Sequence, residues 1–134
     1  MILVDTSAWV EFDRATGSPF DQRLTELIST GGDIAVTEPV LMEVLAGAKD
    51  ERRAGELRRL LTSFGWIPAE SQTDFEAAAR VYRACRREGI TPSGLIDCMI
   101  ASIAMRSNSS VLAADADFAV MSEVIPLTLD SPNR

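Results

Sequence analysis

The sequence contains no histidine among its 134 residues. This absence excludes catalytic sites of the Ser-His-Asp and Cys-His kinds, in which an imidazole acts as the base. It also excludes the zinc sites that depend on histidine ligands. A metal ion in this chain is therefore expected to be held by oxygen atoms, which favours Mg²⁺ or Mn²⁺.

Cysteine and long apolar runs are also scarce. The two cysteines, Cys85 and Cys98, fall in segments with a helical pattern, so we expect buried or free thiols and no disulfide framework. No apolar run approaches the length of a membrane span, and the N-terminus lacks the basic and apolar segments of a signal peptide. These features predict a soluble cytoplasmic protein without a membrane association.

The chain is acidic, with a formal net charge of −7 and a single lysine among its 13 basic residues. This charge is unfavourable for a nucleic-acid-binding protein unless several of the acids surround metal ions. The arginines gather in two groups, which are Arg52, Arg53, Arg58 and Arg59, and Arg80, Arg83, Arg86 and Arg87. Arginine suits both phosphate contacts and salt bridges on a solvated helix face, so both interpretations stay open.

Strand and helix patterns alternate along the chain, and its length suits one domain that spans residues 1–134. We expect strands at residues 1–4, 34–36, 66–68, 111–114 and 125–129. We expect helices at residues 8–12, 20–29, 40–46, 49–64, 73–88 and 95–105, with one helical turn at residues 118–121. This alternation without hairpin turns predicts an α/β fold, a three-layer α/β/α sandwich with a central, mostly parallel sheet.

Local signals set several of these boundaries. Thr6 or Ser7 is expected to cap the first helix, and a Ser93 cap on the helix at residues 95–105 belongs to the structural interpretation of Asp97. A capping box at residues 73–76 is expected to start the helix that follows. The tail from residue 130 onward is expected to be frayed.

Five acidic residues stand where acids are costly or where ligands bind. Asp5 follows the first apolar strand, and Asp115 and Asp117 follow the apolar strand late in the chain. Glu43 and Asp97 lie inside helical segments that are otherwise largely apolar. Burying a carboxylate in such a helix costs free energy unless a cation or a hydrogen-bond donor pairs with it. The carboxyl ends of strands in α/β sheets are where ligands bind.

Each acid taken alone also has a structural interpretation. Asp5, Asp115 and Asp117 suit turns and helix caps, and Glu43 suits the exposed edge of a short helix. Asp97 lies near a first helical turn, where the helix dipole favours negative charge. Taken together, however, the five can converge on one crevice of a doubly wound sheet. Their mutual repulsion there calls for a divalent cation such as Mg²⁺ or Mn²⁺.

The same residues carry a resemblance that covers nearly the whole chain. The segments are VDTSAW at residues 4–9, TEP at 37–39 followed by Glu43, LIDCMIA at 95–101, and DADF at 115–118. In this order and spacing they resemble the motifs of PIN-domain nucleases. The length and the single-domain layout resemble the VapC branch, the toxins of type II toxin–antitoxin pairs.

The resemblance implies a Mg²⁺- or Mn²⁺-dependent endoribonuclease that cleaves RNA. It implies Asp5, Glu43, Asp97 and Asp115 as the catalytic, metal-binding acids, with Asp117 as an outer or second-metal ligand. Ser7 would orient Asp5 or a metal-bound water. A cognate antitoxin and a homodimer are implied as well. Amphipathic segments such as residues 40–46 and 75–85 independently suggest a buried self-interface.

Two other functions are also consistent with a cluster of acidic residues. One is another Asp-based, Mg²⁺-dependent phosphoryl-transfer enzyme. A phosphatase of that kind requires an aspartate where Ser7 stands, and a receiver domain requires a late lysine, whereas the chain has only Lys49. The other is an inactive PIN-type binding module, which the intact acids at all five positions argue against.

Overall fold

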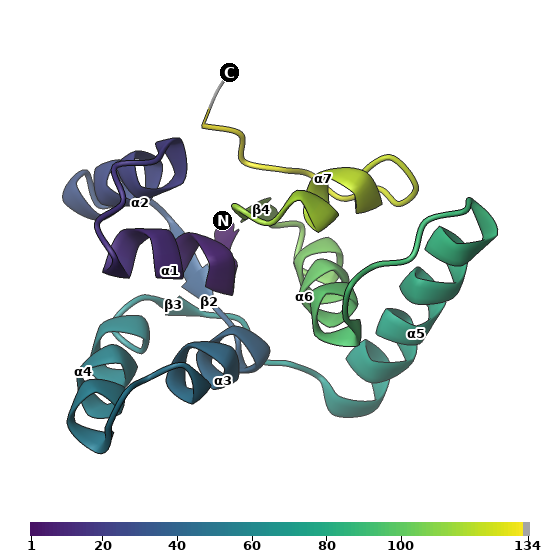
Figure 1. Ribbon diagram of the computed structural model, residues 1–134. Coiled ribbons are helices and arrows are strands. Elements are labelled where there is room, and N and C mark those ends of the chain that lie inside the picture. Colours follow the sequence, from purple (N-terminus) through teal and green to yellow (C-terminus); the bar gives the residue numbers. More distant parts are fainter. Residues whose placement is uncertain (133–134) are drawn as a thin grey trace.

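The computed structural model describes residues 1–132 and contains a four-stranded sheet in the order β3-β2-β1-β4 (Figure 1). All three strand pairs are parallel. The strands are β1 (Ile2–Val4), β2 (Ile34–Val36), β3 (Gly65–Trp66) and β4 (Ser110–Leu112). The predicted parallel sheet is thus confirmed, with β1 in its interior and β3 at one edge.

The strands are apolar because helices cover both faces of the sheet. Leu3, Val4, Ala35, Val36 and Val111 are fully buried. Helices α1 to α4 gather on one side of the sheet in Figure 1, and α5 and α6 lie on the other. This arrangement confirms the expected three-layer α/β/α sandwich. The helices are α1 (Thr6–Asp13), α2 (Pro19–Ser29), α3 (Glu38–Ala46), α4 (Glu51–Leu61), α5 (Ser71–Arg87), α6 (Leu95–Arg106) and α7 (Ala116–Met121).

Three helices begin directly at the carboxyl end of the sheet. Asp5 is the N-cap of α1, Thr37 the N-cap of α3, and Asp115 the N-cap of α7. The expectation that Thr6 or Ser7 would cap α1 is therefore wrong, because the side chain of Asp5 already accepts the Ser7 N–H. The alternative of a Ser93 cap on α6 is also excluded, since Gly94 occupies that position and Ser93 bonds to Asp117.

Helix α5 begins before the predicted capping box. Its first residue is Ser71, and Glu70 is the N-cap without a side-chain cap bond. The Asp74 carboxylate instead reaches back to accept the Glu70 N–H at 2.6 Å. An acid one turn into the helix thus satisfies the N–H of the N-cap residue, which lies three residues before the predicted capping box.

The C-terminal segment differs from the predicted strand and frayed tail. Among the described residues, this segment pairs with β4 only through an isolated parallel bridge between Leu129 and Val111. Asp130 is held in place: its N–H donates to the Val111 carbonyl, and its carboxylate pairs with Arg23 at 2.9 Å. Residues 133–134 of the expected frayed tail lie outside the described residues.

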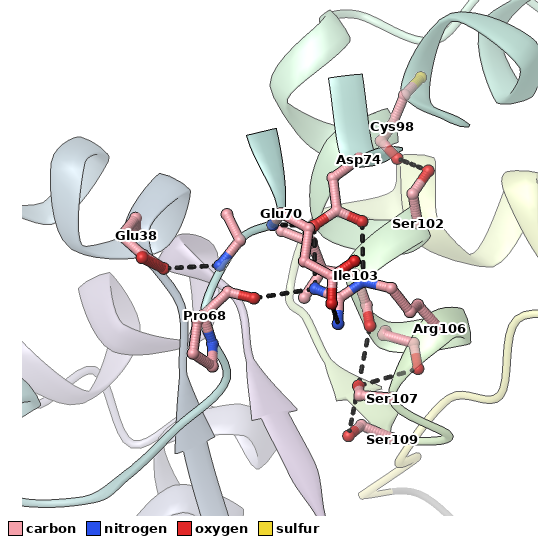
Figure 2. A network of polar contacts seen from close by, with 12 residues as sticks. Glu38, Pro68, Glu70, Asp74, Cys98, Ser102, Ile103, Arg106, Ser107 and Ser109 are labelled. Atoms are coloured by element: carbon pink, nitrogen blue, oxygen red, sulfur yellow. Dashed lines mark hydrogen bonds and ion pairs between the residues drawn. The ribbon is translucent and has the colours of Figure 1, made fainter. Parts of the chain in front are cut away.

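An ion pair joins α5 and α6, the two helices on the face of the sheet opposite α1 to α4 (Figure 2). Arg106, the last residue of α6, donates to both carboxylate oxygens of Asp74 at 2.9 Å and to the Pro68 carbonyl at 2.8 Å. Asp74 is 1% exposed. The brace ties α6 to the start of α5 and to the segment after β3, which fixes the helix that carries Asp97.

Candidate metal centre

The five predicted acids meet at the carboxyl end of the sheet. Asp5 and Asp115 follow β1 and β4, which are neighbours although β4 comes last in the chain. The strand order reverses at this pair, and the crevice beside such a reversal is the usual ligand site of an open α/β sheet. Glu43 reaches the crevice from α3, and Asp97 from the first turn of α6.

The carboxylates form two groups that share Asp97. Oxygens of Asp5, Glu43 and Asp97 lie within 4.8 Å of one another, and so do oxygens of Asp97, Asp115 and Asp117. Asp97 is thus the central acid of the cluster. Two sets of three oxygen ligands with one member in common suit one or two hard divalent cations.

Asp5 is 2% exposed, and its two oxygens differ sharply. Oδ2 accepts the Ser7 N–H at 3.0 Å and the Ser7 hydroxyl at 2.6 Å. Oδ1 is buried without a hydrogen-bond partner among the described residues. Burial raises the pKa of Asp5, the bonds from Ser7 oppose that rise, and the charge of Glu43 adds to it. A buried carboxylate oxygen without a donor is an incomplete environment, and a cation would complete it.

Ser7 connects the two strand ends. While its hydroxyl donates to Asp5, the same oxygen accepts the N–H groups of Ala114 at 2.9 Å and Asp115 at 3.1 Å. The side chain therefore fixes Asp5 relative to the segment that carries Asp115.

Thr6 holds Glu43, a contact that the sequence reasoning missed. The Thr6 hydroxyl donates to Glu43 Oε1 at 2.8 Å. The two residues are 37 positions apart, and they meet only because α1 packs on α3. The sequence offered a threonine beside Asp5, but it held no signal for the partner.

Asp97 lies in an unfavourable electrostatic environment. Burial, followed by the charges of Asp5, Asp115, Glu43 and Asp117, raises the pKa of Asp97 to about 7. The helix dipole at the first turn of α6 does not offset these effects. Among the described residues, no side chain or backbone group donates a hydrogen bond to this carboxylate. The structure therefore places Asp97 among like charges.

Asp117 lies at the outer side of the cluster. Ser93 donates both its N–H, at 3.0 Å, and its hydroxyl to Asp117 Oδ2. These two bonds lower the pKa of Asp117. Asp115 Oδ1 accepts the Asp117 N–H at 2.9 Å, so Asp115 also serves as the cap of α7. The capping interpretation of Asp5 and Asp115 is thus correct, yet both residues still belong to the cluster.

Cys98 follows Asp97 in α6 and is fully buried. Burial, with the nearby Cys85 thiol as a smaller cause, raises the pKa of Cys98 to about 11. Cys98 belongs to neither group of possible metal-binding side chains among the described residues. Cys85 and Cys98 are both buried free thiols, as expected from the sequence. The donor set of the crevice consists of oxygen atoms, which suits Mg²⁺ or Mn²⁺.

The sequence of this chain also matches known proteins. The family model of the PIN domain matches residues 2–124. The VapC ribonuclease Mb1587 of Mycobacterium bovis is 42% identical over 128 residues, which cover 95% of this chain and 96% of the relative. The chain belongs to the VapC family of PIN-domain ribonucleases. The resemblance of the sequence motifs to this family is thereby confirmed.

Solved structures of toxin–antitoxin systems share the fold of this VapC-family chain. A crystal structure of VapBC2 from Rickettsia felis, bound to a DNA fragment from its promoter, aligns with a TM-score of 0.75 at 19% identity. It covers 97% of this chain and 98% of the other. A toxin–antitoxin complex from Klebsiella pneumoniae aligns with a TM-score of 0.72 at 22% identity, covering 98% of each chain. The shared fold thus covers 97% of this chain in the first alignment and 98% in the second.

Proposed function

We propose that this chain cleaves RNA phosphodiester bonds with Mg²⁺ or Mn²⁺ ions held by Asp5, Glu43, Asp97, Asp115 and Asp117. Membership of the VapC family makes the chain an endoribonuclease toxin of a toxin–antitoxin pair. The observation that supports the metal requirement is the pair of carboxylate groups that share Asp97. Asp5 Oδ1, buried and without a donor among the described residues, supports it independently.

The residues divide the work by position. Asp5, Glu43 and Asp97 would hold one ion, while Asp97 with Asp115 and Asp117 would hold a second or an outer ligand shell. Ions held in this way activate a water molecule and neutralise the charge that develops on the phosphate. No protein base is needed, which agrees with a chain that lacks histidine. Ion binding requires the proton to leave Asp97, because only the carboxylate is a ligand.

Ser7 and Thr6 would fix the orientation of the ligands. Ser7 orients Asp5 because its N–H and its hydroxyl both bond to Oδ2. Oδ1 accepts neither of these bonds and stays available to an ion. Thr6 orients Glu43 through Oε1. Because second-sphere partners fix ligand geometry, we assign both hydroxyls a positioning role.

The partners follow from the family. We propose a cognate antitoxin protein that covers the crevice, an RNA substrate, and a C₂ homodimer. Helices α3 and α5 expose the large apolar side chains of Met42 and Phe75, which supports the dimer. Among residues 1–132, no helix is both long and apolar enough to cross a membrane. We propose that the chain acts in the cytoplasm, where its RNA substrates are.

The two alternative functions are not favoured. In a phosphatase of the Asp-x-Asp kind the second aspartate would stand at position 7, but Ser7 there orients Asp5 and bonds the Asp115 backbone. An inactive binding module would not need five carboxylates so close together that their negative charges repel one another. The raised pKa of Asp97 shows what that arrangement costs the metal-free protein.

Expression of the chain alone in bacteria, followed by sequencing of new RNA 5′ ends, tests the function. We expect growth arrest and one dominant cleavage site, and the same expression of an Asp97→Asn variant should produce neither. Arrest without any new 5′ ends would contradict RNA cleavage as the activity.

A further inference from the structure

One buried hydroxyl at the carboxyl end of the sheet has no hydrogen-bond partner among the described residues. Thr37 follows β2 and is 0% exposed. It is the N-cap residue of α3, yet its side chain makes no cap hydrogen bond. Thr37 Oγ1 has no partner among the described residues. Buried hydroxyls are nearly always hydrogen-bonded, so an unpaired one marks a partner that the protein chain does not supply.

The register of the sheet places Thr37 beside Asp5. Ile2 lies opposite Ile34 and Leu3 opposite Ala35, and two further residues along each strand lead to Asp5 and Thr37. Both residues keep an extended backbone, with φ −73° and ψ 158° at Asp5 and φ −134° and ψ 162° at Thr37. Residues opposite each other on parallel strands direct their side chains to the same face. The register therefore places the side chain of Thr37 on the same face of the sheet as that of Asp5, at the adjacent strand end.

Two unpaired buried oxygens thus lie at neighbouring strand ends, Asp5 Oδ1 and Thr37 Oγ1. A carboxylate oxygen only accepts hydrogen bonds or binds cations, whereas a hydroxyl both donates and accepts. Mg²⁺ and Mn²⁺ sites built on a few carboxylates keep several bound waters, and each such water donates hydrogen bonds to nearby acceptors. A hydroxyl beside the carboxylate ligand suits that second-sphere task.

We propose that Thr37 is a positioning residue of the metal centre, whose hydroxyl accepts a hydrogen bond from a water ligand of the ion held by Asp5. The inference rests on the proposed metal-dependent function. It adds a second-sphere residue directly after β2, a strand end that none of the five acids follows. Thr37 acts through the water and touches neither the phosphate nor the ion.

The test compares Thr37→Val, which keeps the shape and removes the hydroxyl, with Thr37→Ser, which keeps the hydroxyl. Calorimetric titration with Mn²⁺ alone measures affinity without RNA. We expect the valine variant to bind Mn²⁺ about 10-fold more weakly or worse, the loss typical of a removed second-sphere partner. Thr37→Ser should stay within about 3-fold of the parent, and Thr25→Val, at an exposed position, is the matched control.

Melting in EDTA separates this role from a structural one. Because Thr37 makes no cap bond, Thr37→Val should melt no lower than the parent without metal, and Mn²⁺ should raise its melting temperature less. A valine variant that binds Mn²⁺ like the parent would overturn the proposal. If valine prevents folding, Thr37→Ala provides a second hydroxyl-free protein, and unchanged Mn²⁺ affinity there overturns the proposal equally. If the Mn²⁺ affinity of the parent depends on the Thr37 hydroxyl but the parent cleaves no RNA, the positioning role is supported and the proposed function is contradicted.

Discussion

At the scale of single residues, the carboxylates of this site perform two tasks with different oxygens. Asp5 uses Oδ2 to accept the Ser7 N–H at the start of α1 and leaves Oδ1 without a donor among the described residues. Asp115 uses Oδ1 to cap α7 while it remains in the cluster around Asp97. A helix cap and a metal ligand are therefore compatible at the same position, and the cap fixes the orientation of the ligand.

Replacing the central acid should stabilise the metal-free protein. Asp97→Asn removes one of several like charges at close range, so the variant should melt higher than the parent in EDTA. Mn²⁺ should raise the melting temperature of the parent by mass action and that of the variant much less. Thermal melts of the two proteins with and without Mn²⁺ check this. A variant that melts lower in EDTA and responds equally to Mn²⁺ would return Asp97 to a role in helix stabilisation.

The pKa of Asp97 predicts a pH dependence of stability. Its pKa is about 7 in the folded protein, against ~3.9 in an unfolded chain. The folded state therefore holds a proton that the unfolded state releases, and the free energy of unfolding falls as pH rises from about 4 to about 7. The raised pKa of Asp5 acts in the same direction, and the lowered pKa of Asp117 acts only below this range.

Melts in EDTA between pH 5 and pH 8 measure this dependence. The parent should be more stable at the acid end, and Asp97→Asn should show a clearly flatter profile. Mn²⁺ affinity of the parent should rise over the same range, because the ion competes with the proton. A parent whose stability increases steadily with pH in EDTA would contradict the assigned environment of Asp97.

At the scale of elements, the site forms because strands end where helices begin. Parallel strands deliver Asp5, Thr37 and Asp115 to one edge, and the N-termini of α1, α3 and α7 start there. Helices α3 and α6 then bring Glu43 and Asp97 over the same edge, where the two helices contact each other. The acids and hydroxyls of the site come from several elements, so the site depends on helix packing as much as on the sheet.

The sequence predicted those parts that depend on local pattern. Apolar runs identified β1 and β4, and acids directly after them identified Asp5 and Asp115. The partners of Thr6 and Ser93 were not predictable, because they lie 37 and 24 residues away and meet through helix packing. The strand predicted at residues 125–129 rested on an apolar pattern that suits an edge strand, whereas the segment pairs with β4 at a single bridge among the described residues.

Breaking the brace between α5 and α6 should destabilise the fold. Arg106→Met leaves Asp74, which is 1% exposed, without its ion-pair partner. Since Arg106 itself is 27% exposed, the cost should lie between the ~1 kcal/mol of a surface pair and the ~3–5 kcal/mol of a buried pair. Denaturant titration measures the loss, and Arg86→Met on the exposed side of α5 is the control. An unchanged midpoint for Arg106→Met would contradict the brace.

At the scale of the whole molecule, exposed apolar side chains indicate a surface through which two copies of the chain can form a dimer. Met42 is 54% exposed and Phe75 is 61% exposed, on helices that the sequence pattern already marked as a self-interface. We expect the parent to form a dimer at micromolar concentration in the absence of antitoxin. The double variant Met42→Glu/Phe75→Glu should be a folded monomer, because a buried charge without a partner is costly.

Light scattering distinguishes the two masses, and Gln72→Glu, at an exposed position near Phe75, is the control for added charge. A parent of monomer mass would contradict the dimer. A double variant that remains dimeric would place the interface elsewhere on the molecule.

The central claim is that RNA cleavage depends on metal ions held by the carboxylate cluster. The most direct measurement is cleavage of RNA by the purified chain with Mn²⁺, with Mg²⁺ and with excess EDTA, alongside Asp97→Asn and the exposed control Glu76→Gln. We expect cleavage by the parent and by Glu76→Gln, within a few-fold of each other, with either ion. Asp97→Asn should be inactive, and EDTA should stop the parent, because the charge on the phosphate is then uncompensated. Robust cleavage by the parent in EDTA, or near-parental cleavage by Asp97→Asn with Mn²⁺, would contradict the account.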